Sequence, residues 1–250
     1  MGNFKEYAKL YDVIYADKDY KAEADYVIAF IKKHHPKATT ILNLGCGTGK
    51  HDTHFTKAGY RVTGVDMSEN MVGIAQKNAK KNGINADFVC GDIRTVRLKK
   101  KFDVVVSLFH VMSYQTTNAD VLNALETAKT HLAKNGLLIF DFWHGPGVLT
   151  DLPAVRSRKF KTKDLSLTRV SVPTLHTAEN VVDVKFELYY KTGKNKQYSY
   201  LEELHRMRYF FEPELQLMLE QKGLLITGRY EWMTEKAPAA NSWNALLICQ

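Results

Sequence analysis

The chain has 250 residues, of which 45% are hydrophobic, and it carries a formal net charge of +8. No apolar run reaches the roughly 18 residues of a membrane-spanning helix, and charged residues among the first thirty argue against a secretory signal. We therefore expect a cytoplasmic protein without membrane contact, whose three cysteines are buried thiols rather than disulfide partners or metal ligands.

Helices and strands alternate in the first part of the chain. The spacing of apolar residues predicts helices over Tyr20–His34, Lys50–Ala58, the segment from its cap Ser68 to about Lys81, and Ala119–Leu132. It predicts strands over Thr39–Leu44, Arg61–Val65, Ala86–Cys90, Phe102–Phe109 and Leu137–Trp143. This alternation is typical of βαβ units around a parallel sheet.

The pattern changes to period two between about Lys159 and Phe211, which predicts antiparallel strands inserted into the α/β domain. Within it, alternate residues share a face: Val182, Val184, Phe186, Leu188 and Tyr190. Pro213 then opens a helix that runs to Lys222, and the strands Leu224–Glu231 and Asn244–Cys249 close the chain.

Three glycines, Gly45, Gly47 and Gly49, stand between the first predicted strand and its helix. A dinucleotide-binding fingerprint would place the third glycine at position 50, and a phosphate-binding loop would follow Lys50 with Ser or Thr rather than His51. The loop still offers N–H donors at a helix N-terminus, which suit a carboxylate. The alternative is that these glycines only allow the chain to turn and bind no ligand.

Two aspartates are expected at the same edge of the sheet as the glycines, because the carboxyl ends of parallel strands share one crevice. Asp66 ends the second strand, where it can accept both hydroxyls of a ribose, and Asp92 follows the third strand, near an adenine. The alternative for Asp66 is an ordinary cap at a strand end. A carboxylate, a ribose and an adenine together describe S-adenosylmethionine.

The chain resembles the class I S-adenosylmethionine-dependent methyltransferases in five motifs, in that family's order and spacing over about 100 residues: "NLGCGTGKH" (43–51), "VTGVDMSENM" (62–71), "FVCGDIR" (88–94), "FDVVVSLFHVMSY" (102–114) and "LAKNGLLIFDFW" (132–143). The resemblance implies a Rossmann-like, seven-stranded, mostly parallel sheet over residues 1–155 and 212–250. It implies S-adenosylmethionine as cofactor, held by Gly45, Cys46, Gly47, Gly49, Asp66, Met67, Asp92, Ile93 and Leu108.

The flanking segments "YAKLYDVIYADKDYKAEADYV" and "YLEELHRMRYFFEPELQLMLEQKGL" are similar to sugar-nucleotide amino N-methyltransferases and, more distantly, to glycine and sarcosine N-methyltransferases. This resemblance implies that residues 156–211 form an antiparallel lid on the acceptor side. It also implies that Tyr7, Tyr11 and Tyr15 line the cofactor pocket. The alternative is that these tyrosines, spaced four apart, form one face of an amphipathic helix.

Four residues are candidates for acceptor chemistry. Tyr114 stands where the sugar enzymes carry a histidine, and His110, one turn earlier, is a substitute. Glu203 and His205 share one face of the inserted ladder. Arg206 and Arg208 share the other face, and with Arg156 and Arg158 they would pair with a pyrophosphate, unless the charges simply face solvent. Trp143 and His144 end the fifth strand, where an acceptor should lie.

Methyl transfer to an amine needs only its lone pair, whereas a hydroxyl needs a base or a metal. No metal-ligand spacing stands out, so we expect N-methylation of a small molecule, with a nucleotide amino sugar as the first choice. O-methylation, an RNA or protein methyltransferase that docks through its basic surface, and a non-enzymatic cofactor-binding module are the alternatives. A nucleic-acid partner is disfavoured because the basic residues are scattered. The sequence does not determine the oligomeric state, and a dimer is one option.

Overall fold

The computed structural model describes residues 10–193 and 197–250. The chain forms two compact units: a core unit of Asp19–Asp151 with Tyr209–Gln250, and a second unit of Leu152–Arg208 with the N-terminal segment to Lys18, which we call the lid unit after the role predicted for it. In the part of the chain that is described, no helix is both long and apolar enough to cross a membrane.

The core unit is built on a sheet whose strand order is β3-β2-β1-β4-β5-β11-β10. The first five strands are parallel, β11 is antiparallel to β5, and β10 is antiparallel to β11. Their bounds are β1 (Thr40–Leu44), β2 (Arg61–Asp66), β3 (Asp87–Cys90), β4 (Phe102–Ser107), β5 (Leu132–His144), β10 (Ile226–Glu231) and β11 (Asn244–Cys249). The prediction of a seven-stranded, mostly parallel sheet is thereby confirmed.

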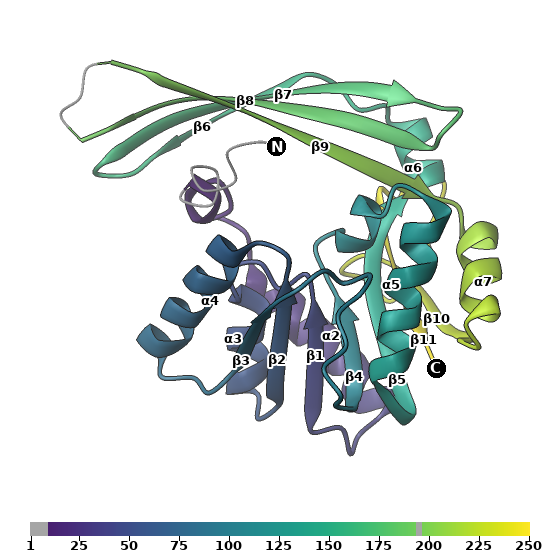
Figure 1. Ribbon diagram of the computed structural model, residues 1–250. Coiled ribbons are helices and arrows are strands. Elements are labelled where there is room, and N and C mark those ends of the chain that lie inside the picture. Colours follow the sequence, from purple (N-terminus) through teal and green to yellow (C-terminus); the bar gives the residue numbers. More distant parts are fainter. Residues whose placement is uncertain (1–9, 194–196) are drawn as a thin grey trace. The chain divides into compact units, whose positions relative to one another are not determined.

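Helices cover both faces of this sheet (Figure 1). On one face lie α2 (Tyr20–His34), α3 (Lys50–Lys57) and α4 (Glu69–Asn82), and on the other lie α5 (Asn118–His131) and α7 (Glu212–Gln221). Side-chain caps begin three of them, because Asp19, Ser68 and Thr117 accept hydrogen bonds from the first turns of α2, α4 and α5. The alternating strands and helices therefore bury the sheet on both sides.

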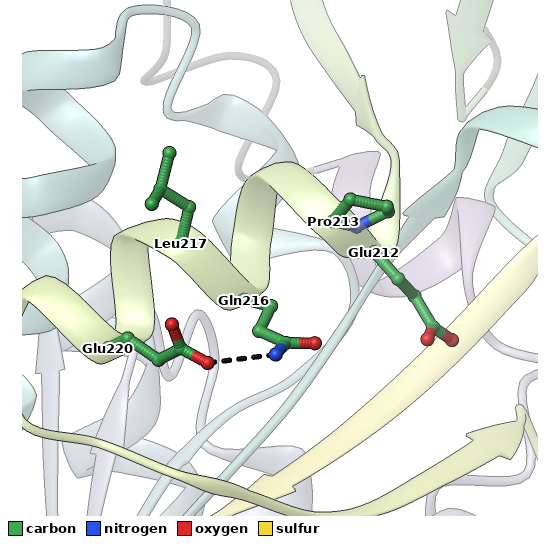
Figure 2. A pocket seen from close by; sticks show the side chains of 5 residues that line it. All are labelled: Glu212, Pro213, Gln216, Leu217 and Glu220. Carbon is green, nitrogen blue, oxygen red and sulfur yellow. Dashed lines mark hydrogen bonds between the residues drawn. The ribbon is translucent and has the colours of Figure 1, made fainter.

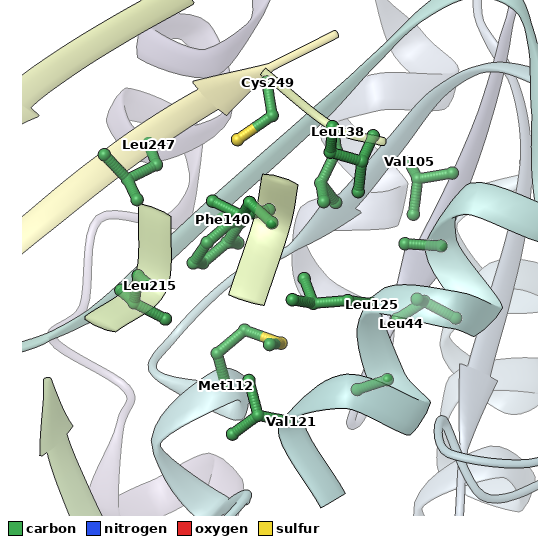
Figure 3. Close-up of a cluster of buried hydrophobic side chains, with 14 of the residues drawn as sticks. Leu44, Val105, Met112, Val121, Leu125, Leu138, Phe140, Leu215, Leu247 and Cys249 are labelled. Carbon is green, nitrogen blue, oxygen red and sulfur yellow. The ribbon is translucent and has the colours of Figure 1, made fainter. Parts of the chain in front are cut away.

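The larger hydrophobic cluster lies between the sheet and the pair α5 and α7. Figure 3 shows Val105, Leu138 and Leu247 from the strands facing Leu125 and Leu215 from the helices. All five of these side chains are at most 2% exposed, so this layer fixes the strand ends that precede the site loops.

The lid unit is an antiparallel sheet in the order β6-β7-β8-β9. Its strands are β6 (Arg156–Lys161), β7 (Leu165–His176), β8 (Val181–Thr192) and β9 (Ser199–Phe210). Leu167, Leu188 and Leu201 lie on one face and pack against Leu10 and Ile14 of the N-terminal segment, in which residues 10–14 are helical. This apolar contact explains why that segment belongs to the lid unit.

Four local features differ from the sequence prediction. A 3₁₀ turn, η1 (Val111–Tyr114), and a short helix, α6 (Gly145–Thr150), were not predicted. Strand β5 begins at Leu132 rather than Leu137, and the "KNG" segment forms an irregularity in its pairing with β4, with a left-handed backbone at Asn135. Helix α7 starts at Glu212, so that Pro213 is its second residue.

Candidate functional site

The glycine loop joins β1 to α3 and is held against β2 by its backbone. The N–H groups of Gly45 and Cys46 both donate to the carbonyl of Val65, at 2.8 and 2.9 Å. A Cβ on Gly45 would lie 2.5 Å from a methyl carbon of Val111 in η1, so only glycine fits there. At Gly47, where φ is +55°, the space beside the Cα is open. The loop therefore presents bare backbone at Gly47 while η1 packs against it at Gly45.

Asp66 at the end of β2 is bound to this loop. Its Oδ2 accepts the N–H of Gly47 at 2.9 Å, and its Oδ1 accepts the N–H of Ser68 at the same distance. Burial raises the pKa of Asp66, while these two N–H donors lower it. Each carboxylate oxygen keeps lone-pair capacity for a further donor. The predicted ribose acceptor is thus placed beside the glycines by a direct hydrogen bond from Gly47.

Asp92, after β3, accepts hydrogen bonds from Arg94, a residue that was not predicted from the sequence. The Arg94 guanidinium donates to both Asp92 oxygens at 2.5 to 3.0 Å and, through Nη1, to Asp120 Oδ1 at 2.7 Å. The hydrogen bonds from Arg94 lower the pKa of Asp92. Since Asp120 lies in the first turn of α5, this bridge fixes the loop after β3 to the N-terminus of that helix.

The segment after β4 turns sharply at two residues with left-handed backbone, Phe109 and His110. The fully buried carboxylate of Asp141 in β5 accepts the His110 N–H, 3.1 Å from each oxygen, and thereby stabilises this turn. Asp141 Oδ2 also lies 2.8 Å from His110 Nδ1, at an angle that does not make a hydrogen bond. The imidazole therefore lies beside the buried side chain of Asp141.

A second layer of buried polar groups lies beneath the glycine loop. Asn43 donates to Asp52 Oδ2 at 2.9 Å, and His51 Nε2 lies 2.8 Å from Glu23 Oε2. Asp52 is fully buried, and burial raises its pKa to about 7. These pairs join β1, α2 and α3 under the loop, so they set its position from below.

Comparison with known proteins agrees with this geometry. Residues 41–136 match the family model described as a methyltransferase domain. The dTDP-3-amino-3,6-dideoxy-alpha-D-glucopyranose N,N-dimethyltransferase of Streptomyces fradiae is 28% identical over 88% of this chain and 84% of its own length. A dTDP-3-amino-3,4,6-trideoxy-alpha-D-glucopyranose N,N-dimethyltransferase of Streptomyces venezuelae is 27% identical over 88% and 91%.

The fold comparison points the same way. The crystal structure of Streptomyces venezuelae DesVI superposes with a TM-score of 0.81 at 24% identity, covering 97% of each chain. The chain is an S-adenosylmethionine-dependent methyltransferase. The cofactor of this methyltransferase is accordingly S-adenosylmethionine.

The residues present fit that cofactor. Gly47 leaves open space beside its Cα, and Asp66 next to it has acceptor capacity for ribose hydroxyls. Met67 follows Asp66 and is 70% exposed, so it offers an apolar surface at the same strand end. The side chains of Cys46, Ile93 and Leu108 are buried, which leaves backbone groups for the contacts predicted there. These individual contacts stay predictions.

The candidates on the acceptor side of the core unit differ in accessibility. Tyr114 ends η1 and is 46% exposed, whereas His144 is buried and its Nδ1 lies 2.9 Å from the Ser242 carbonyl. Trp143 packs its ring edge-on against Trp243, with centroids 5.3 Å apart. Hence His144 is a structural residue, while Tyr114 and His110 keep the acceptor roles predicted for them.

The remaining predicted site residues lie in the lid unit. The rings of Tyr11 and Tyr15 are 4.7 Å apart and pack beside the cluster of Leu167, which fits the amphipathic-helix alternative. Tyr7 lies outside the described residues. Glu203 is buried, and burial raises its pKa. His205 contacts the Phe186 ring, and burial lowers the pKa of His205 to about 4.

Two open hollows among the described residues lie away from the strand ends that carry the site. One of about 400 Å³ runs along α7, where Glu212, Gln216 and Glu220 line it (Figure 2). The other, of about 510 Å³, is lined by the start of β3 and by Leu98 and Lys100. Both are open surface features whose lining includes neither Asp66 nor the glycine loop, so we place the site at the loop.

Two residues that shape the site, Asp141 and Arg94, were not predicted, although the sequence contains weak indications of them. Asp141 is a charge inside the apolar run "LLIFDFW", and a buried charge requires a partner. Arg94 follows Asp92 by two residues, but its second partner, Asp120, is 26 positions away. The first could have been suspected from sequence, whereas the second depends on tertiary structure.

Proposed function

We propose that this methyltransferase transfers a methyl group to the amine of a nucleotide-linked amino sugar. The observation that carries the proposal is the extent of its similarity to the relative from Streptomyces fradiae. That similarity spans 88% of the chain, far beyond residues 41–136 that match the methyltransferase family model. The similarity therefore includes much of the sequence outside the cofactor domain, where acceptor specificity is expected to lie.

The chemistry of an amine suits the residues after β4. S-adenosylmethionine supplies a methyl group on a sulfonium, and an amine needs only a free lone pair and a place for its proton. His110 lies at the strand end with the Asp141 carboxylate 2.8 Å from its Nδ1, so a proton taken up by the imidazole would meet a counter-charge. Tyr114, which is exposed, can orient the acceptor by hydrogen bonding.

A matched pair of acceptors tests the proposal. A dTDP-linked amino sugar and the same compound with a hydroxyl in place of the amine are incubated with enzyme and S-adenosylmethionine, and the products are resolved by mass. We expect methylation of the amine at a kcat/KM at least a hundredfold above that of the hydroxyl. Equal use of the two compounds would favour O-methylation, and the use of neither would contradict a nucleotide-sugar acceptor.

A further inference from the structure

Three arginines lie on one face of the lid sheet, at its β6 edge. In the antiparallel pairing of β6 with β7, Arg158 is directly opposite Arg169, and Arg156 is opposite Ser171. Residues two apart on a strand share a face, so Arg156 and Arg158 lie on the face of Phe160, which packs beside the apolar cluster of this unit. Arg156 and Arg158 are exposed, and Arg169 is half-buried.

A bound anion would relieve the repulsion between these arginines. Like charges directly opposite each other on neighbouring strands repel and destabilise the pair. Among the described residues, no carboxylate makes an ion pair with any of the three arginines. The contrast is Arg206 on the other face of the sheet, which is paired with both Glu179 and Asp183. Within the described part of the chain, the sheet thus pairs an arginine with acids on one face and leaves three arginines without an ion-pair partner on the other.

Aromatic rings, rather than a carboxylate, position the side chain of Arg169. Its guanidinium carbon lies 4.7 Å from the centroid of the Phe186 ring and 5.9 Å from those of Phe160 and Tyr15. Cation–π contacts of this kind orient a guanidinium while leaving its N–H groups free to donate. Within the described residues, the Arg169 Nε makes no hydrogen bond although it is buried. An oriented guanidinium with unused donors is what a phosphate site requires.

We infer that this face of the lid sheet binds the diphosphate of the acceptor through Arg156, Arg158 and Arg169. The inference rests on the proposed function and adds to it the residues that recognise the anionic part of the substrate. It replaces the predicted pairing of Arg206 and Arg208 with a pyrophosphate, because Arg206 is already neutralised and Arg208 is buried. Arg169, which was not predicted from the sequence, replaces Arg206 and Arg208 as a partner of the diphosphate.

The dimensions favour a compact dianion over a nucleic-acid backbone. Residues two apart on a strand are about 7 Å from each other, and opposite residues on paired strands about 5 Å. The three arginines therefore converge on a space that matches one diphosphate. On the same face, the cross-strand row that starts at Arg156 continues through Ser171 and Phe186 to Glu203. Three strand spacings, about 14 Å, separate its ends, so a sugar linked to the diphosphate would extend toward Glu203.

The test measures anion binding rather than turnover, so its outcome is independent of the acceptor assay. Inorganic pyrophosphate is titrated calorimetrically into the full chain saturated with S-adenosylhomocysteine. Two variants remove a proposed contact, Arg158→Gln on the exposed strand and Arg169→Gln. Two controls remove a positive charge from the opposite face, Lys159→Gln on β6 and Arg206→Gln on β9.

We expect each of the two variants to weaken pyrophosphate binding at least tenfold and each control less than twofold. A change of similar size in all four proteins would mean nonspecific attraction by net charge and would overturn the inference, as would wild-type protein that binds no pyrophosphate. Stronger binding of single-stranded RNA than of pyrophosphate, lost in the same two variants, would also overturn it in favour of a nucleic-acid surface. Unchanged affinity for S-adenosylhomocysteine verifies that each variant is folded.

Discussion

Replacing Asp52 with asparagine should change how the stability of the protein depends on pH. Asp52 is fully buried under the glycine loop, and burial raises its pKa from 3.8 to about 7. The folded state therefore binds this proton more tightly than the unfolded state does. The contribution of Asp52 to stability is fully present below about pH 4 and is lost as the pH rises through about 7. The asparagine variant has no such titration and can still accept the hydrogen bond from Asn43.

The size of the effect follows from the two pKa values. Linkage with values of 3.8 and about 7 gives a loss of roughly 2–3 kcal/mol from the wild-type free energy of unfolding between about pH 5 and pH 8. Urea denaturation of wild type and Asp52→Asn at both pH values, followed by circular dichroism, measures this loss directly. All other titrating groups are common to the two proteins and cancel. Parallel stability profiles for the two proteins would refute a buried, protonated Asp52.

Three further predictions concern the cofactor loop and the acceptor candidates. Asp66→Ala should weaken S-adenosylhomocysteine binding roughly 10- to 150-fold, as expected for the loss of a charged hydrogen-bond partner worth about 1.5–3 kcal/mol; an unchanged Kd in calorimetry would remove Asp66 from the site. Gly45→Ala should lower the free energy of unfolding by about 2–4 kcal/mol more than Gly59→Ala, because both positions have positive φ and only Gly45 lacks space for a Cβ; equal denaturation midpoints would contradict the clash. A lower kcat/KM for the acceptor, with cofactor affinity unchanged within about threefold, is expected for Tyr114→Phe, Glu203→Gln and His205→Ala. Altered sedimentation with intact kinetics would instead make the lid unit a dimer interface.

The cofactor half of the site could be predicted from sequence because its residues are local. Gly45 and Gly47 follow a strand directly, and Asp66 ends the next one, so the parallel-sheet rule alone brings them to one edge. The hydrogen bond between Gly47 and Asp66 confirms that prediction. The backbone conformation of His110 was not predictable, because it depends on Asp141, which lies 31 positions later on another strand.

Arg156 and Arg158 could be named from the sequence as candidates for a pyrophosphate, whereas the position of Arg169 beside them could not be predicted. Alternation along β9 indicated correctly that Glu203 and His205 share a face that Arg206 does not. Which residues of β6 and β7 lie opposite each other depends on the register across the turn between Lys161 and Leu165. A shift of one residue would have moved Arg169 to the other face, and the sequence alone does not determine that register.

The measurement that tests the central claim most directly is the position of the transferred methyl group. The enzyme is incubated with S-adenosylmethionine carrying a ¹³C-labelled methyl and a dTDP-linked amino sugar, and the product is examined by heteronuclear NMR. We predict a labelled methyl carbon bonded to the sugar nitrogen. In Asp66→Ala we predict that this product is lost in parallel with cofactor binding. A labelled methyl on a hydroxyl oxygen, or no transfer to the amino sugar by a protein that binds S-adenosylhomocysteine, would contradict these predictions.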